Sequence, residues 1–427
     1  MHDAIGLDFG TTNSVVARVG ADGQPYLIDF AAPGEISAVF RSALCFYEDD
    51  SGRGLACEAG PWAIAEYLEF PQGSRFLQSF KSVAASATFE HASIFDKRMR
   101  FEELGRLFLA KLASHTGGAL AHPPQRVVVG RPVHYAGGRP DEALARQRYD
   151  AMFAGFGAEI HYVYEPLGAA FSYAARIEDA ATILVADFGG GTSDFSVVRV
   201  APPGAAKRCT PLGHAGIGIA GDQFDSRIVD KLVLPILGYG GLYRSFDKQL
   251  EIPRGYFADF NDWSRLALMR NRRTLEELHK LQKNAFDPEA IGRMIAIIDQ
   301  EQGYRLYDSV GQLKRALSQV DAAEFHFDGE GVKIDATVTR AQFEGWIADD
   351  LARMAATVDR ALAESGVDEA GIDRVFLTGG TSLIPAVRAL FTQRFGEDRI
   401  ASGGELTSIA NGLALIGQED DVAAWAV

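Results

Sequence analysis

One short pattern occurs twice in this chain and constrains its fold more than any other feature. Residues 4–17 read AIGLDFGTTNSVVA, and residues 184–198 read LVADFGGGTSDFSVV. In each copy a strand-like apolar run ends near an aspartate, a glycine-rich turn follows, and the chain returns to β-branched residues. This order predicts two antiparallel hairpins and excludes a Walker A loop, which needs a helix and a Gly-Lys-Ser/Thr ending. We interpret the repeat as two related lobes that each contribute one hairpin.

Strands and helices alternate along much of the remaining chain. Residues 126–133 (RVVVGRPV) predict a strand and a turn, and residues 160–175 predict a strand that breaks at Glu165 into a helix of small residues. After a predicted strand at Val375 to Leu377, the glycine pair that begins at Gly379 predicts a turn, and a helix is expected to begin near Pro385. The alternation predicts an α/β fold built from layers of sheet and helix.

Two further segments have helical patterns. Thr339 and Gln342 have the spacing of a capping box before a long amphipathic helix, and Gly366 is placed to end that helix. Residues 238–303 are rich in aromatic and turn-forming residues and then contain two helical patterns, TLEELHKLQK and PEAIGRMIAIIDQE. We expect this stretch to form an inserted helical subdomain.

Composition limits the class of protein and its partners. The chain has 427 residues, 47% of them hydrophobic, and is large enough for more than one core. Its formal net charge of -15 argues against nucleic acid and against an anionic membrane surface as partners. The cysteines Cys45, Cys57 and Cys209 are widely spaced, which predicts free thiols in a reducing compartment. We recognise no signal peptide or membrane-length apolar run and expect a cytoplasmic protein.

The two turns have the chemistry of a phosphate site. Glycine lets backbone N–H groups approach a polyphosphate closely and threonine adds a hydroxyl; the turns are Gly10-Thr11-Thr12 and Gly189-Gly190-Gly191-Thr192. Asp8 and Asp187 shortly precede them, and Mg²⁺ is usually held by one or two carboxylates together with substrate phosphates. One such turn alone is more often an ordinary strand and turn. Its repetition favours a magnesium nucleotide bound between two lobes.

These motifs resemble the ATPase domain of DnaK-type heat-shock chaperones, within the actin/hexokinase/heat-shock ATPase superfamily. IGLDFGTTNSVVA resembles the first family signature, VADFGGGTSDFSVV the second and VFLTGGTSLIP the third, with Glu165-Pro166 in the expected order. The resemblance runs nearly end to end except for residues 238–303. It is most similar to the short YegD-type chaperone-like proteins, which consist of the ATPase part without a peptide-binding domain.

The resemblance implies an α/β, actin-like ATPase fold with two lobes of duplicated ribonuclease-H-like subdomains around a central nucleotide cleft, and with a helical insertion. The expected divisions are lobe I at 1–175 with an outer subdomain at about 30–105, lobe II at 176–385 with an outer helical subdomain at about 225–320, and a C-terminal return at 386–427. The final stretch, QEDDVAAWAV, resembles the acidic and then apolar linker that docks on the ATPase domain of full-length chaperones. A frayed terminus is the alternative.

The resemblance also implies slow ATP hydrolysis with ATP/ADP and Mg²⁺ as cofactors. Asp8, Asp187 and Asp194 would surround the Mg²⁺. Lys81 would orient the attacking water and steady the γ-phosphate, and Glu165 would polarise that water. A solvated surface lysine is the alternative for Lys81. The nucleotide-binding residues implied are Gly10, Thr11, Thr12, Asn13, Gly189, Gly190, Gly191, Thr192, Gly221, Asp222, Lys314, Arg315, Ser318, Gly379, Gly380 and Thr381.

Some positions depart from the family or leave alternatives open. Gly311 stands where the family has a ribose-binding glutamate, Leu383 where it has a second adenine-stacking arginine, and Leu406 where it has an acidic residue. Weaker nucleotide affinity or looser base preference would follow. Pro132, with the Glu165-Pro166 pair, resembles the proline switch of the family, or is an ordinary turn proline. Lys314 and Arg315 are otherwise basic residues of a helix surface.

Two rival functions share the superfamily. GIAGDQFD at 218–225 invites comparison with sugar kinases, in which the aspartate of a Gly-Asp-Gln motif deprotonates the sugar hydroxyl. In those kinases the second phosphate loop follows this motif, whereas DFGGGT precedes it here. An actin-like filament protein is the structural rival. We instead expect a monomer that binds ATP and client or co-chaperone proteins.

Overall fold

The computed structural model describes residues 2–32, 35–49, 54–137, 139–205, 207–261, 266, 269–401, 403–404 and 406–427. The chain divides into two units: Met1–Gly221 with Leu351–Val427, and Asp222–Asp350. Both hairpins found in the sequence belong to the first unit. The division into two lobes at 175/176, with their outer subdomains, stays a prediction.

The first hairpin lies at the centre of a mixed sheet. Its strand order is β13-β12-β1-β2-β3, with bounds Glu159–Tyr164, Arg126–Arg131, Ala4–Phe9, Asn13–Val19 and Pro25–Leu27. β1 pairs antiparallel with β2, as predicted, and parallel with β12. β6 (Phe40–Arg41) also pairs with β2. Ile5, Leu7 and Phe9 of β1 are fully buried, which explains the apolar alternation in the sequence.

The second hairpin lies at the centre of a sheet with the same topology. Its order is β22-β21-β14-β15-β16, with bounds Ile400–Ala401, Arg374–Thr378, Ala181–Phe188, Ser193–Val200 and Cys209–Ile217. β14 pairs antiparallel with β15 and parallel with β21, just as β1 pairs with β2 and β12. The repeated sequence pattern therefore reflects a repeated sheet.

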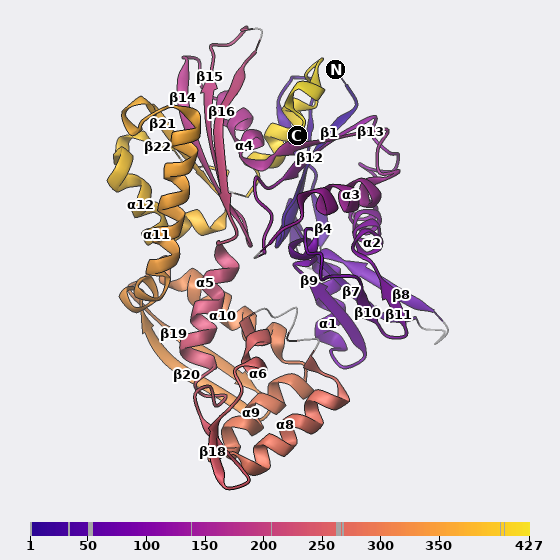
Figure 1. Cartoon of the computed structure of the whole chain (residues 1–427). Coiled ribbons are helices and arrows are strands. Elements are labelled where there is room, and N and C mark those ends of the chain that lie inside the picture. The colour runs from indigo at the N-terminus through magenta and orange to yellow at the C-terminus, as the bar shows by residue number, and fades with distance from the viewer. Residues whose placement is uncertain are drawn as a thin grey trace. The chain divides into compact units, whose positions relative to one another are not determined.

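In the first unit, each of two helices follows one sheet in the sequence but packs on the other sheet. α4 (Glu165–Ala174) follows β13 of the first sheet but packs on β14, β15 and β16 of the second; α13 (Ser408–Ile416) follows β22 but packs on β1, β2 and β12 of the first. The two helices also pack on each other, and Figure 1 shows α4 beside the yellow C-terminal segment. A methyl group added to Gly412 would collide with the carbonyl group of Gly168. The small residues of both helices permit this close approach.

Gly412→Ala should therefore destabilise the protein. Because backbone atoms leave no space for the methyl group, we expect the free energy of unfolding to fall by about 3 kcal/mol in urea titrations. Gly345→Ala in α11 (Arg340–Ser365) is the matched control, since among the described residues nothing lies within 4 Å of the Cβ atom it would gain. That control should stabilise the protein by up to about 1 kcal/mol. Equal effects of the two substitutions would contradict the close helix contact.

The segment around Lys81 follows a three-stranded sheet of the first unit. A three-stranded sheet has the order β8-β7-β9, with bounds Leu55–Ala59, Ala43–Glu48 and Ser74–Gln78. β9 leads into the 3₁₀ turn η1 (Phe80–Val83). This part of the sequence also forms the hairpins β4–β5 (Phe30–Ala32, Glu35–Ser37) and β10–β11 (Ala92–Ile94, Lys97–Met99) and the helices α1 (Gly60–Glu69) and α2 (Phe101–Ser114). The helix α3 (Glu142–Phe153) connects β12 to β13.

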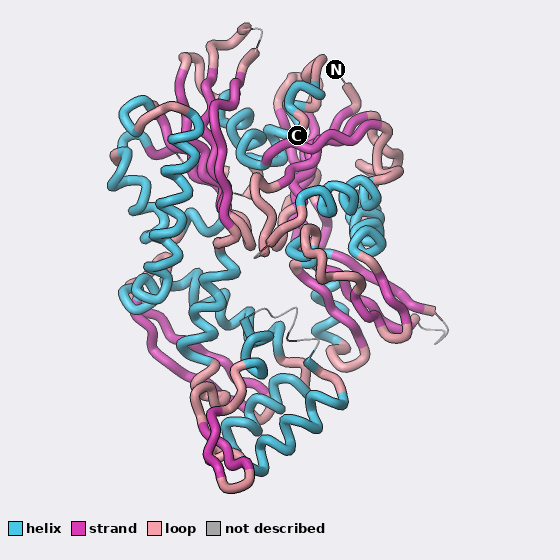
Figure 2. The backbone as a smooth tube through the Cα atoms, viewed as in Figure 1, coloured by secondary structure: helices cyan, strands magenta, loops and turns pink. Residues whose placement is uncertain are grey.

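The described part of the second unit is mainly helical and also contains the hairpins β17–β18 and β19–β20 (Figure 2). Its elements are α5 (Gly221–Ile228), η2 (Val229–Val233), β17 (Leu242–Ser245), β18 (Lys248–Glu251), α6 (Gly255–Ala258), η3 (Asp259–Asn261), α8 (Arg272–Asn284), α9 (Pro288–Asp299), α10 (Gly303–Leu317), β19 (Ala322–Gly329) and β20 (Val332–Thr339). α8 and α9 confirm the two helical patterns. The capping box is also confirmed, because the amide of Gln342 donates to Oγ1 of Thr339 and Oε1 of Gln342 accepts from the amide of Thr339.

α11 runs from the second unit into the first and ends before Gly366, which has φ 68°. The remaining elements of the first unit are η5 (Glu369–Gly371), η6 (Gly380–Leu383), α12 (Pro385–Phe395), η7 (Glu397–Arg399) and η8 (Val422–Trp425). α12 begins at the predicted proline. Among the described residues, no helix has the length and hydropathy that a membrane span requires. Cys45, Cys57 and Cys209 are free thiols, as predicted.

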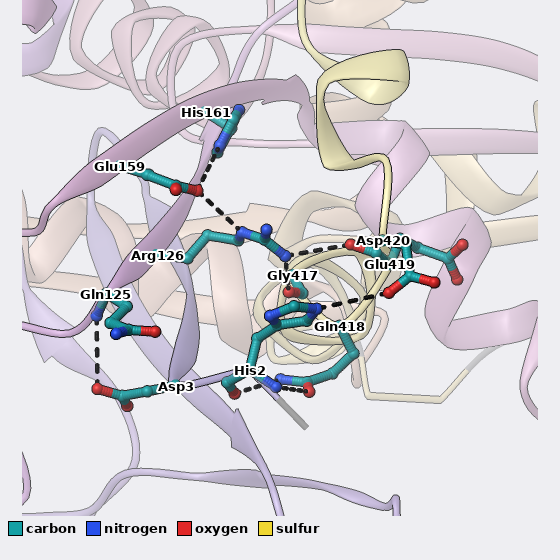
Figure 3. Close-up of polar contacts among 10 residues, drawn as sticks. All are labelled: His2, Asp3, Gln125, Arg126, Glu159, His161, Gly417, Gln418, Glu419 and Asp420. Carbon is teal, nitrogen blue, oxygen red and sulfur yellow. Dashed lines mark hydrogen bonds and ion pairs between the residues drawn. The ribbon is translucent and has the colours of Figure 1, made fainter.

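The C-terminal tail is docked on the first unit and is not frayed. Arg126 at the start of β12 donates to the carbonyl groups of Gly417 (2.8 Å) and Glu419 (3.1 Å), at the centre of the polar contacts in Figure 3. Trp425 is only 6% exposed, and its ring meets that of Phe171 of α4 edge-on at 4.8 Å. The amide of Val427 donates to the carbonyl group of Tyr162 in β13.

Trp425→Ala should lower the free energy of unfolding by about 3 kcal/mol, because it removes a buried indole from the contact with α4. Urea titration with the exposed Ala423→Ser as the control would measure this effect. Unchanged stability of the Trp425 variant would show that the tail is not docked in solution.

Candidate functional site

The hairpin registers place three acidic side chains near the glycine turns. Asp8 lies in β1 and Asp187 in β14, each two residues before a glycine. Asp194 in β15 is directly opposite Asp187, whereas the equivalent position opposite Asp8 is Val15. The second hairpin therefore carries an acidic pair where the first carries one acid. Asp187 and Asp194 are both buried.

Asp194 connects the second sheet to the chain that follows β12. Its Oδ1 accepts hydrogen bonds from the backbone amides of Val133 (3.0 Å) and His134 (3.2 Å), directly after Pro132. Among the described residues, no hydrogen bond of normal geometry reaches the buried Oδ2 of Asp194, although the side chain of Thr192 interacts with this carboxylate and opposes the rise of its pKa. A buried carboxylate oxygen without a partner is costly, so it points to a missing ligand.

Lys81 is buried and paired with Glu165. The Nζ of Lys81 donates to Oε1 of Glu165 at 2.6 Å, and the two side chains are 6% and 7% exposed. Lys81 comes from η1 and Glu165 from the first turn of α4. The alternative of a solvated surface lysine is therefore wrong. An ammonium group has three donors, and the contact with Glu165 uses one of them.

These five ionisable groups interact electrostatically. Burial, followed by the charge of Glu165, raises the pKa of Asp8 to about 7 and the pKa of Asp194 to about 8. The same two causes raise the pKa of Asp187 well above its ordinary value. Burial by itself would lower the pKa of Lys81, but the charges of Glu165 and Asp8 outweigh it and raise the pKa. The site thus holds more acidic groups than its one lysine can keep ionised.

The residues fit a hydrated divalent cation. Within the described ranges, no three Asp, Glu, His or Cys side chains come close enough together to bind a metal ion directly. Mg²⁺ does not require such a cluster, because it keeps several waters and takes one or two carboxylates together with phosphates. The unpartnered oxygen of Asp194 and the raised pKa of Asp187 are the features that such an ion would relieve.

Hydrogen bonds fix the two turns beside these acids. The hydroxyl of Ser42 donates to the carbonyl group of Gly10 at 2.6 Å, and Oδ1 of Asn13 accepts from Arg41 at 3.0 Å. In the second turn the amide of Gly189 donates to the carbonyl group of Thr192 at 2.9 Å. The predicted phosphate residues of each turn therefore lie together at the end of its hairpin.

The third glycine element lies beside the second turn. β21 runs parallel to β14, with Thr378 opposite Asp187, and Gly379 follows with φ 85°. A Cβ atom at Gly379 would collide with the carbonyl group of Phe188, so only glycine fits there. Among the described residues, nothing lies within 4 Å of a Cβ atom placed on Gly380. Thr381 is buried. The structure therefore brings this element to the hairpin that carries Asp187.

The residues predicted for adenosine divide between the two units. Lys314, Arg315 and Ser318 are in the second unit, whereas Gly379, Gly380 and Thr381 are in the first, so the adenosine pocket stays a prediction. The boundary between the units falls between Gly221 and Asp222, at the start of α5.

The second-unit residues have the following contacts. Nζ of Lys314 pairs with Oδ1 of Asp225 in α5 at 2.8 Å, so it is not a solvated surface lysine. Ser318 donates to the carbonyl group of Lys314 within the same helix. The side chain of Arg315 is 66% exposed. In the first unit, Leu383 and Leu406 are 61% and 47% exposed, so both departures from the family pattern are surface residues.

The sequence did not indicate three groups that shape the site. Ser42 fixes the first turn, and the amides of Val133 and His134 fix Asp194. Serine and backbone amides carry no distinctive pattern, so only Pro132, which precedes the two amides, could have drawn attention to this place. Arg148, which is described below, also gave no sequence signal.

Comparison with models of protein families shows what this chain is similar to. A family model described as "Hsp70 protein" matches residues 78–237 and 294–418, which is about two-thirds of the chain. The matched segments include Lys81, Glu165, Asp187 and Asp194. Residues 238–293 fall between them and lie within the stretch that the sequence set apart as an insertion.

Proposed function

Because this chain belongs to the Hsp70 family, we propose that the acids at its two hairpins bind a magnesium nucleotide and that Lys81 and Glu165 carry out ATP hydrolysis. The family has the actin-like ATPase fold, and the duplicated mixed sheets of the first unit belong to it. Members of the family are ATP-binding chaperone-type ATPases. The YegD-type resemblance, slow turnover, a monomeric state and a cytoplasmic location are finer parts of the proposal.

The buried Lys81–Glu165 pair, accompanied by the buried Asp187 and Asp194 and the half-buried Asp8, is the observation that carries this proposal. An ion pair with both partners about 7% exposed is a poor device for stability, since desolvation offsets most of its attraction. Buried ionisable groups with raised pKa values are instead typical of functional sites. The three acids supply negative charge that requires a cation, and the turns supply backbone donors for phosphates.

Each residue has a defined task in this mechanism. Asp8, Asp187 and Asp194 would hold the waters of a Mg²⁺ ion, which supplies charge neutralisation of the phosphates when it is bound. Gly10–Asn13 and Gly189–Thr192 would direct backbone and hydroxyl donors at the phosphates. The two donors of Lys81 that Glu165 does not use can contact a phosphate oxygen and the attacking water. Glu165 would accept a hydrogen bond from that water and orient it.

Titration calorimetry tests the proposal most directly. Mg-ATP and Mg-ADP should bind with measurable heat, and ATP with excess chelator much more weakly, because the acids repel a triphosphate that carries no cation. Titration with GTP would measure the base preference. Purified protein should then convert bound ATP to ADP in a single-turnover assay. Absence of Mg-ATP binding at millimolar concentration would overturn the proposal.

The docked tail supports a regulatory part of the proposal. Trp425 packs on Phe171 of α4, and Glu165 is the first residue of the same helix. We expect deletion of residues 422–427 to change the rate of ATP hydrolysis at saturating Mg-ATP. An unchanged rate in the truncated protein would remove this part and leave the nucleotide site in place.

A further inference from the structure

The segment that presents Lys81 has little regular structure of its own. Ser79 has φ 55°, a left-handed conformation that is unusual for serine, and η1 lasts only from Phe80 to Val83. Residues 84–89 then form turns without a strand or a helix. Such a segment cannot fix an ammonium group through a hydrogen-bonded ladder, so other contacts must hold it.

One arginine supplies these contacts. Nη1 of Arg148 donates to the carbonyl groups of Val83 (2.8 Å), Ala84 (2.9 Å) and Ser86 (3.1 Å), and Nη2 donates to that of Phe89 at 2.5 Å. The guanidinium also lies 5.8 Å from the centre of the Phe89 ring. Four carbonyl groups of the segment that follows Lys81 are therefore bound by one planar side chain. The fixed fork of the guanidinium restricts their relative positions.

Arg148 lies on a rigid element. α3 forms the connection between the parallel strands β12 and β13, and Tyr149, Met152 and Phe153 of this helix are almost fully buried. The amide of Asp141, which caps α3, adds a fifth contact by donating to the carbonyl group of Ala85 at 2.9 Å. The loop is thereby fastened to the helix.

The same helix connects the loop to the rest of the site. The ring of Tyr149 lies 6.1 Å from that of Phe9, the residue after Asp8, and α3 leads into β13 and then into Glu165. Arg148 thus joins the Lys81 segment to the framework that carries Asp8 and Glu165. Gln147, the preceding residue of α3, is instead exposed to solvent.

We propose that Arg148 is a positioning residue for Lys81. Arg148 holds the ammonium group of Lys81 at the distances from Glu165 and from the reacting phosphate that hydrolysis requires. This inference rests on the proposed ATPase function of the same site. Misplacement of a reacting group by about 1 Å can reduce a rate about a hundredfold. The hydrogen bonds of Arg148 go to the segment after Lys81 and not to the predicted phosphate turns. Loss of Arg148 should therefore leave nucleotide binding largely intact.

Arg148→Gln should therefore slow single-turnover hydrolysis of bound Mg-ATP by about tenfold or more, and change the Mg-ATP dissociation constant by less than about threefold. Arg148→Lys should be intermediate, because one ammonium group cannot bind four carbonyl groups with the geometry of a guanidinium. Arg106→Gln, at an exposed arginine of α2, is the charge-matched control and should not change the rate.

A double-mutant cycle distinguishes positioning from a general loss of structure. If Arg148 acts through Lys81, then Arg148→Gln should have no further effect on the residual rate of a Lys81→Met protein. The inference would be overturned if Arg148→Gln slowed the Lys81→Met protein as much as the protein with Lys81. It would also be overturned if Arg148→Gln alone left the rate unchanged, or if it reduced the affinity for Mg-ATP as much as the rate. If the glutamine variant does not fold, the same cycle with Arg148→Lys gives the decision.

The cycle also separates this inference from the function on which it rests. An unaltered protein that does not hydrolyse ATP, or a Lys81→Met variant that is fully active, would contradict the proposed function, and the inference would fall with it. The inference alone would be contradicted if the unaltered protein hydrolysed ATP, the Lys81→Met variant were impaired, and the effects of Arg148→Gln and Lys81→Met on the rate were additive.

Discussion

Asp187→Asn should weaken the binding of Mg-ATP by about a hundredfold, since it removes a carboxylate that would hold a water of the Mg²⁺ shell. In the absence of the metal the effect should reverse. The neutral amide does not repel the triphosphate and avoids burying a charge, so metal-free ATP should bind at least as well as to the unaltered protein. Calorimetry with and without Mg²⁺ measures both parts.

The reversal makes this result specific to a metal role. Asp179→Asn, at an exposed acid of the first unit, is the matched control and should change neither affinity. Thermal unfolding adds a second measurement: at a Mg-ATP concentration between the two dissociation constants, the unaltered and Asp179→Asn proteins should gain stability and the Asp187→Asn protein should gain little. Equal weakening with and without Mg²⁺ would show that Asp187 binds the nucleotide in another way or only supports the fold.

Lys81→Met should reduce the rate of ATP hydrolysis by about a hundredfold to a thousandfold while Mg-ATP affinity changes by less than about threefold. The methionine side chain keeps the apolar stem but removes the charge that would steady the γ-phosphate as the bond breaks. Single-turnover kinetics and calorimetry on the same preparation give the two values. The exposed Lys97→Met in β11 is the control.

Stability must be separated from catalysis in this experiment. Loss of Lys81 leaves Glu165 buried without its partner, and breaking a buried pair can cost about 3–5 kcal/mol. The double variant Lys81→Met/Glu165→Gln removes the uncompensated charge and should recover stability without recovering activity. Equal losses of affinity and rate in the single variant, or a recovered rate in the double variant, would contradict the catalytic role of Lys81.

The sequence predicted the parts of the fold that depend on neighbouring residues. β1, β2, β14 and β15 were recognisable because apolar and β-branched residues flank glycine turns, and α4 and α12 because each begins at or beside a proline. The capping box at Thr339 was predictable for the same reason, since its two hydrogen bonds join residues three positions apart. Repetition of one local pattern also predicted two related lobes with one hairpin each, and the shared topology of the two sheets was found in the structure.

The sequence could not show how these parts pack. α4 and α13 each pack on the sheet that the other helix follows, and the contact of Gly412 with Gly168 joins positions far apart in the chain. Periodicity indicates which face of a helix is apolar, but not which sheet will cover that face. The docking of Trp425 on α4 was likewise one of two open alternatives until the tertiary contacts were known.

The candidate site divides in the same way. By itself the sequence determined two hairpins, their acids and their glycine turns, because strand alternation and turn chemistry act within about ten residues. Only the tertiary structure decided that Lys81 is buried against Glu165, that Asp194 accepts hydrogen bonds from residues after β12, and that Arg148 binds the segment following Lys81. Burial and pairing of charges depend on which distant segments exclude water from them, and a linear pattern does not contain that information.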